Sequence, residues 1–154
     1  TNHAYWNLRG SGDVRTHRAR LFASRRLERR PDRVPTGRLL PLEGTRYDLR
    51  APLDAPERAG FPLEDFDDYF VADRPAGAGL STIAEILDPE SGRRLEVASN
   101  APGFVFYTGD FAGCRGLCVE PSEYPDAPNR PEFPSSVIGT GESRTLDLVW
   151  RVGA

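Results

Sequence analysis

The chain has 154 residues, of which 38% are hydrophobic and 28% charged, with a net charge of −3 and a pI of about 5.4. This length suits a single domain with a sizeable core, and the acidic balance argues against the broad basic surface of a nucleic-acid-binding protein. The longest apolar runs are far shorter than the ~18 residues of a membrane span, so we expect no membrane partner.

The predicted elements, in chain order, are short strands. Alternating patterns predict a strand over 18–27 and a hairpin around 88–92, where a proline and a glycine preset the turn. Further strands are expected over 104–108 and 117–120, with surface loops over 54–62 and 126–134. A final strand should bury the face formed by Leu146, Leu148, Trp150 and Val152. No stretch keeps a helical apolar period for three turns, so we predict an all-β, antiparallel architecture of the sandwich or barrel type.

The segment GLCVEPSEYPDAPNRP (116–131) is the most informative part of the chain. An apolar, β-prone run over 117–120 ends on the carboxylate of Glu120, and the four prolines that follow are expected to stop the strand. Catalytic groups often lie where regular structure gives way to a loop, which makes Glu120 a candidate base. By itself the pattern fits equally a strand end with a solvated glutamate.

All 20 basic residues are arginine, and lysine, glutamine and methionine are absent. We interpret the arginine cluster over 25–33 as solvated surface rather than a phosphate site. Cys114 and Cys118 are four positions apart, ~13 Å on a strand, which is too far for a disulfide and favours a reduced, cytoplasmic setting. Two scattered histidines and two cysteines do not have the spacing of a zinc site, and no glycine-rich phosphate loop is present. We therefore expect no metal and no cofactor.

Four motifs lie in the same order as in the aldose 1-epimerases, or galactose mutarotases. They are TNHAYWNL (1–8), FDDYFV (66–71), PGFVFYTG (102–109) and the segment 116–131. The last is long and unusual in composition, which makes it specific, whereas FDDYFV alone is weak. The chain therefore resembles that family from residue 1 to about residue 152, although it corresponds only to the C-terminal half of a typical member.

The resemblance implies a large antiparallel β-sandwich, with residues 1–154 forming one domain that is the C-terminal part of a longer protein. It also implies that Glu120 is the base and His3 the acid in opening a sugar ring, exchanging roles for ring closure. Asp67 matches the carboxylate that accepts hydrogen bonds from sugar hydroxyls, and Val105 stands at a sugar-contacting position. In the family, the missing half supplies another histidine and an arginine to the site.

Several positions leave alternatives open. Asp65 and Asp68 lie close enough to compete with Asp67 for its role, although the motif order favours Asp67. His17 matches a position in an ordinary strand of the family and is interpreted as structural. Tyr5 and Trp6 are candidates to line a sugar cleft, although such a pair is more often core.

The apolar wall that would make Glu120 an effective base is expected from Phe106 and Tyr124. Val105 replaces the glutamine that many members carry, so the preferred hexose is open.

Two other functions compete with an epimerase acting on a monosaccharide such as galactose or glucose. One is a sugar-binding module of the same fold without catalysis. The other is a glycoside hydrolase in which Asp67 and Glu120 act as the carboxyl pair. Only the epimerase gives His3 a role. The sequence does not specify an oligomeric state.

Overall fold

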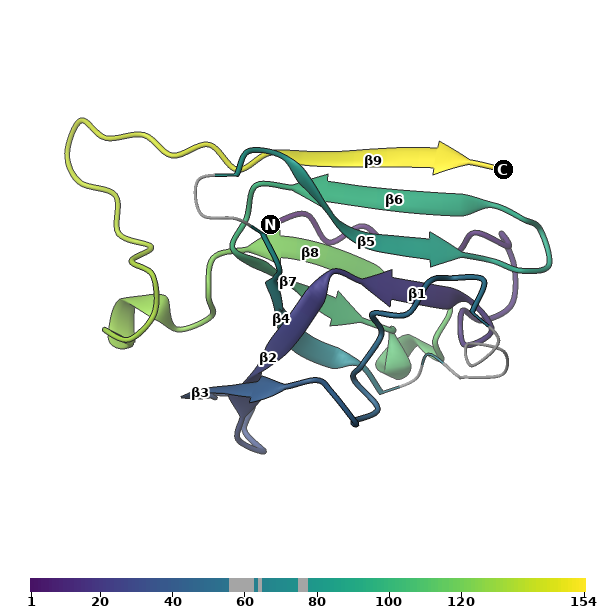
Figure 1. Cartoon of the computed structure of the whole chain (residues 1–154), viewed down its shortest axis with the longest axis horizontal. Helices are drawn as coiled ribbons and strands as arrows, with labels where there is room; N and C mark the ends of the chain where they lie inside the picture. Colours follow the sequence, from purple (N-terminus) through teal and green to yellow (C-terminus); the bar gives the residue numbers. More distant parts are fainter. Residues whose placement is uncertain (56–62, 64, 75–77) are drawn as a thin grey trace.

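The computed structural model of the chain describes residues 1–55, 63, 65–74 and 78–154, which form nine strands in two antiparallel sheets (Figure 1). The four-stranded sheet has the spatial order β1 (Arg18–Leu21), β5 (Ser81–Leu87), β6 (Arg94–Ser99) and β9 (Leu148–Gly153). The five-stranded sheet has the order β3 (Pro35–Pro41), β2 (Ala23–Arg29), β4 (Asp67–Ala72), β7 (Gly103–Tyr107) and β8 (Cys118–Ser122). The predicted all-β class is confirmed.

The main core lies where alternate side chains of both sheets meet. Phe104 and Phe106 of β7 belong to it, and so do Ile86, Leu95 and Val97 of the four-stranded sheet. Because successive side chains of a strand point to opposite faces, the remaining side chains of β7 lie on the other face of the five-stranded sheet. We call this second face the outer face.

A smaller apolar cluster covers part of the outer face. Its buried members come from β2, β4 and the segment after β8, which includes the short 3₁₀ turn η3 (Ala127–Asn129). A second 3₁₀ turn, η2 (Asp110–Ala112), lies between β7 and β8 and does not contribute to the cluster. They are Leu27, Tyr69, Val71, Tyr124, Ala127 and Phe133. The Tyr69 hydroxyl donates to the Ser122 carbonyl at 3.0 Å, which ties β4 to the end of β8. The outer face is therefore ordered by packing next to the candidate site.

The predicted hairpin is confirmed as β5 and β6, joined by a turn in which Gly92 has a φ of 74°. The strand predicted over 18–27 is instead two strands that belong to different sheets. The chain changes sheet at Phe22, whose N–H donates to the Ile83 carbonyl and whose own carbonyl accepts from the Asp73 N–H. Strands β3 and β4 were not predicted as strands.

Two expectations about strand ends are wrong. The strand that carries Glu120 continues through Pro121, which pairs with Phe104, because β8 is an edge strand and a proline there breaks no ladder on its free side. The final strand does place Trp150 and Val152 on the same face as the core residues of β6, yet they are 36% and 60% exposed. β9 is the edge strand of its sheet, and the described residues cover this part of its face only partly.

The predicted loop over 126–134 is a loop that contains η3, whereas most of the loop predicted over 54–62 lies outside the described residues. Within the described residues, no helix has the length and apolar character needed to cross a membrane.

Candidate active site on the outer face of the five-stranded sheet

Glu120 lies on the outer face because of its position in β8. Val119 belongs to the main core, so its neighbours Cys118 and Glu120 point to the opposite side. The register places Cys118 opposite Tyr107 and Glu120 opposite Val105. Strand β4 continues the row, since Asp67 pairs with Tyr107. The register therefore aligns three of the four predicted site residues across neighbouring strands on one face.

The fourth, His3, arrives from the beginning of the chain. Trp6 and Leu117 form an isolated antiparallel bridge with N–H···O distances of 2.8 and 2.9 Å, which fixes the first residues alongside the start of β8. A Cβ added to Gly116 would lie 3.0 Å from the Cβ of Tyr5, so glycine allows this close approach. The bridge carries His3 to Glu120, and their Nε2 and Oε1 atoms are 3.4 Å apart.

Aromatic rings hold the imidazole of His3. Tyr5 stacks on it with ring centroids 5.1 Å apart, and Tyr107 meets it edge-on at 6.2 Å. Tyr5 therefore lies at the candidate site, whereas Trp6 packs against Trp150. These contacts limit the orientations of a side chain that is still 52% exposed.

The environment of Glu120 favours proton transfer. Its residue is 8% exposed, and burial raises the pKa of its carboxyl above the ordinary value. The charge of His3 opposes this rise, while the negative charge of Asp67 adds to it. The expected contribution of Phe106 is wrong, because that ring belongs to the main core on the opposite face. Glu120 is thus a stronger base than a solvated glutamate.

Cys118 is a member of the site that the sequence reasoning missed. Its sulfur lies 3.4 Å from Nδ1 of His3, so the imidazole contacts the thiol on one side and the carboxylate of Glu120 on the other. Burial raises the pKa of this thiol to about 12, which keeps it protonated at neutral pH. Its position two residues before Glu120 on the same strand was the available signal. The two cysteines are free, as expected.

The three candidate aspartates are separated by their positions. Asp67 faces Glu120 on the outer face and pairs with Arg29 at 3.3 Å and Arg33 at 2.5 Å. Asp68 is buried, opposite the core residue Phe106, and pairs with Arg26. Asp65 is an exposed residue with a φ of 58°.

Of these three aspartates, Asp67 is therefore the one that faces the candidate site. The interpretation of the 25–33 arginines as solvated surface is incorrect for Arg26 and Arg29, whose side chains are 16% and 30% exposed and hold these aspartates.

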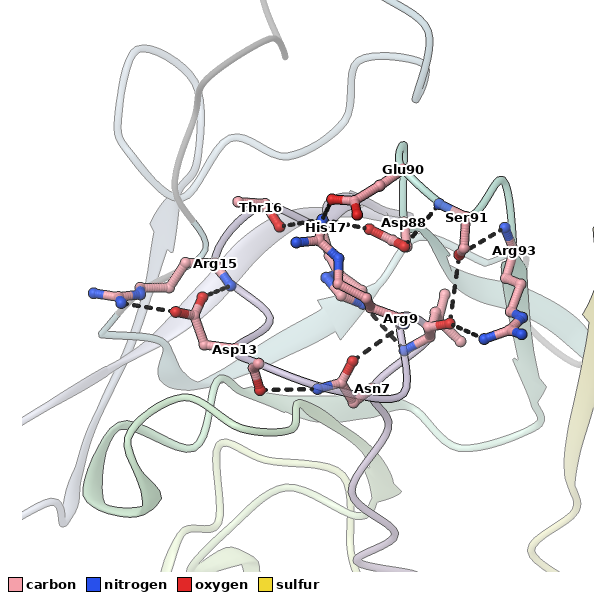
Figure 2. Close-up of polar contacts among 12 residues, drawn as sticks. Asn7, Arg9, Asp13, Arg15, Thr16, His17, Asp88, Glu90, Ser91 and Arg93 are labelled. Carbon is pink, nitrogen blue, oxygen red and sulfur yellow. Dashed lines mark hydrogen bonds and ion pairs between the residues drawn. The ribbon is translucent and has the colours of Figure 1, made fainter.

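His17 lies apart from this site in a buried polar network, one residue before β1 (Figure 2). Its Nε2 accepts a hydrogen bond from the Leu8 N–H at 3.1 Å, and burial lowers the pKa of the imidazole. Beside it, Arg9 binds the fully buried Asp88 at 3.0 Å and the exposed Glu90 at 3.1 Å. The network ties the segment that follows His3 to the β5–β6 turn.

Comparisons with known proteins identify the family of the chain. The model of the aldose 1-epimerase family matches residues 1–151. Similar proteins include a galactose mutarotase of Rattus norvegicus, 33% identical over 92% of this chain and 46% of its own length. An aldose 1-epimerase of Streptococcus thermophilus is 30% identical over 96% of this chain and 47% of its own length.

The fold agrees as well. A crystal structure of a GalM/aldose epimerase homologue from C. elegans superposes with a TM-score of 0.83 at 25% identity, covering 99% of this chain and 50% of that one. The chain thus spans about half the length of the relatives it matches. The match along nearly all of its residues shows that the chain belongs to the aldose 1-epimerase family.

Proposed function

We propose that this chain carries the acid and base of an aldose 1-epimerase, which interconverts the α and β anomers of an aldohexose such as galactose or glucose. The observation that carries the proposal is the approach of the half-exposed His3 to Glu120 at 3.4 Å on the outer face of the five-stranded sheet. The two groups are of the types that this reaction needs, since ring opening removes one proton and supplies another.

Ring opening requires proton transfer at two oxygens. Glu120 takes the proton of the C1 hydroxyl while protonated His3 gives one to the ring oxygen, and the bond between C1 and that oxygen breaks. The open aldehyde then rotates about C1–C2. Closure on the other face of C1 reverses both transfers, which returns the protons to the two side chains. Each group contributes typically 10²–10⁴-fold when it is positioned for such a transfer.

The surrounding residues fit a sugar. Asp67 offers acceptor oxygens for hydroxyl groups, and Arg29 and Arg33 hold its carboxylate in place. Val105, opposite Glu120, presents an apolar surface in place of an amide, so selectivity there comes from shape rather than from hydrogen bonds. The same arrangement disfavours a glycoside hydrolase, because Asp67 is held by two arginines and the closest ionisable partner of Glu120 is an imidazole.

Polarimetry tests the proposal directly. Added to freshly dissolved α-galactose or α-glucose, the protein should accelerate the approach to the equilibrium rotation in proportion to its concentration. Binding of either sugar, measured by calorimetry, with a rate that stays at the value of water would instead identify a sugar-binding module without catalysis. Release of a free phenol from an aryl galactoside would identify a hydrolase.

A further inference from the structure

Three side chains of the candidate site are also typical metal ligands. The sulfur of Cys118, a ring nitrogen of His3 and a carboxylate oxygen of Glu120 all lie within 4.8 Å of one another. Thiolate, imidazole and carboxylate are the donors that Zn²⁺ uses in proteins, and the thiolate favours such a cation over Mg²⁺ or Ca²⁺. The linear spacing predicts no such site, because the three residues meet only through the bridge between Trp6 and Leu117.

The distances suit a tetrahedral ion. A zinc ion bonds sulfur at ~2.3 Å and nitrogen at ~2.0–2.1 Å. An ion shared by the Cys118 sulfur and the His3 Nδ1, which are 3.4 Å apart, would have a bond angle of about 100°, close to the tetrahedral value. The oxygen of Glu120 faces Nε2, on the other edge of the ring, but it lies within 4.8 Å of the other two ligand atoms, so turning the His3 ring and the Glu120 side chain brings it to the ion.

The negative charge of Glu120 and the exposure of His3 also favour a bound cation. Glu120 is nearly buried, and among the described residues its only ion pair is with His3. The neighbouring arginines Arg29 and Arg33 are bound to Asp67 instead. A divalent cation would therefore compensate a buried carboxylate better than the imidazole does. The half-exposed side chain of His3 leaves a route from solvent to the three ligand atoms.

We propose that Cys118, His3 and Glu120 form an inhibitory site for a thiophilic divalent cation of the zinc class. Binding replaces the thiol proton of Cys118 by the metal, and the proton leaves to solvent. An ion on Nδ1 of His3 prevents the imidazole from becoming the doubly protonated acid, and it binds the carboxylate oxygen with which Glu120 would take a proton, so it stops ring opening. The inhibition rests on the proposed function, whereas the binding itself does not.

Cobalt(II) is the probe for binding, because a cobalt–thiolate bond gives a charge-transfer absorption that neither imidazole nor carboxylate produces. Titration of the chain with Co²⁺ should produce this band at one equivalent, and Zn²⁺ should abolish it. Cys118→Ser should remove the band. Cys114→Ser is the matched control, since Cys114 is the other free, buried cysteine, and it should keep the band. Absence of the band in the unaltered chain, or its loss only in Cys114→Ser, overturns the site.

A second variant protects the test against misfolding of Cys118→Ser. His3→Gln changes an exposed residue and should weaken Co²⁺ binding at least tenfold while the circular dichroism spectrum is retained. Unchanged affinity in His3→Gln overturns the proposed ligand set.

Polarimetry then separates the two proposals. Zn²⁺ should slow mutarotation in proportion to its occupancy, and equal inhibition of Cys118→Ser would overturn the inhibitory role. A chain that gives the cobalt band without accelerating mutarotation retains the site and loses the proposed function. A chain that accelerates mutarotation but gives no cobalt band retains the proposed function and loses the metal site.

Discussion

The two histidines of this chain lie in environments that contrast in almost every respect. His3 is exposed and reaches a nearly buried carboxylate, Glu120, whose only ion pair among the described residues is with this imidazole. His17 is buried beside Asp88, whose oxygens accept from the Ser91 N–H at 3.0 Å and from Arg9 at 3.0 Å (Figure 2). The first carboxylate has spare acceptor capacity, and the second has little.

The pKa shifts of the two carboxyls follow this difference. Burial raises the pKa of Glu120, whereas hydrogen bonds from Ser91 and Arg9 outweigh burial and lower the pKa of Asp88. A carboxylate with a raised pKa exchanges protons readily, and one with a lowered pKa holds its charge. A histidine beside a carboxylate therefore has one environment suited to proton transfer and another suited to stability.

The largest effect is expected from the proton-transfer pair. Glu120→Gln and His3→Asn keep the shape of each side chain but remove its ability to take or give the proton. Each should reduce the rate of mutarotation by about 10²–10⁴-fold, measured by polarimetry. His17→Gln is the control and should keep the activity of the folded protein. Full activity in either site variant would show that the roles are assigned to the wrong residues.

The next effect should fall on stability alone. Asp88→Ala removes the acceptor of Arg9 and of the Ser91 N–H from a fully buried position, which should cost about 3 kcal/mol. Thermal unfolding should show a Tm lower by roughly 6–12 °C. Glu90→Gln is the matched control because Glu90 binds the same arginine but its side chain is 72% exposed, and it should cost less than about 1 kcal/mol. Similar losses of stability in the two variants would show that the burial of Asp88 does not decide its contribution to folding.

A third prediction concerns the pH dependence of folding. Burial lowers the pKa of His17, so the unfolded state binds its proton more tightly, and stability falls as pH drops below the ordinary histidine value of ~6.5. The free energy of unfolding should therefore decline between pH 7.5 and 5.5, above the range in which most carboxylates titrate. Denaturant titrations of His17→Gln should show a slope shallower by up to about 1.4 kcal/mol per pH unit. Equal slopes would show that burial does not lower the pKa of His17 in the folded protein.

The fold class and much of the strand pattern follow from local periodicity, as the β5–β6 hairpin shows. The pattern fails where the cause is not local. The alternation over 18–27 continues through Phe22 although the chain changes sheet there, since sheet membership depends on distant partners. Two aspartates at the start of β4, and the glycine and prolines of β3, lower the β propensity of strands that tertiary pairing nevertheless stabilises.

The candidate site shows the same division. The sequence singled out Glu120 by its place near the end of an apolar run, and the resemblance to the epimerases supplied His3. The contact between them depends on the bridge of Trp6 with Leu117, which no spacing rule predicts. Cys118 was considered only as a disulfide or zinc-motif residue, so its contact with His3 was missed. Each of these residues can be recognised in the sequence by itself, whereas the contacts between them depend on the tertiary structure.

The smallest predicted effect is also the sharpest test of the contrast, because it reverses sign between the two carboxylates. The pKa of Glu120 is raised in the folded state, so its contribution to stability is fully present below the unfolded value of ~4.3 and is lost as pH rises through the folded pKa. At pH 7 Glu120→Gln should therefore raise the Tm by up to about 3 °C, and at pH 4 the difference should vanish.

Asp88→Ala should lower the Tm at pH 7, since the lowered pKa of Asp88 means that its stabilisation is present above ~3.9 and is lost on acidification. Scanning calorimetry of both variants at the two pH values measures the pair of effects. A Tm lowered in both variants at pH 7 would make Glu120 a structural carboxylate like Asp88. The charged form of such a carboxylate is stabilised by the fold, which lowers its pKa and makes it a weaker base toward the hydroxyl of a sugar.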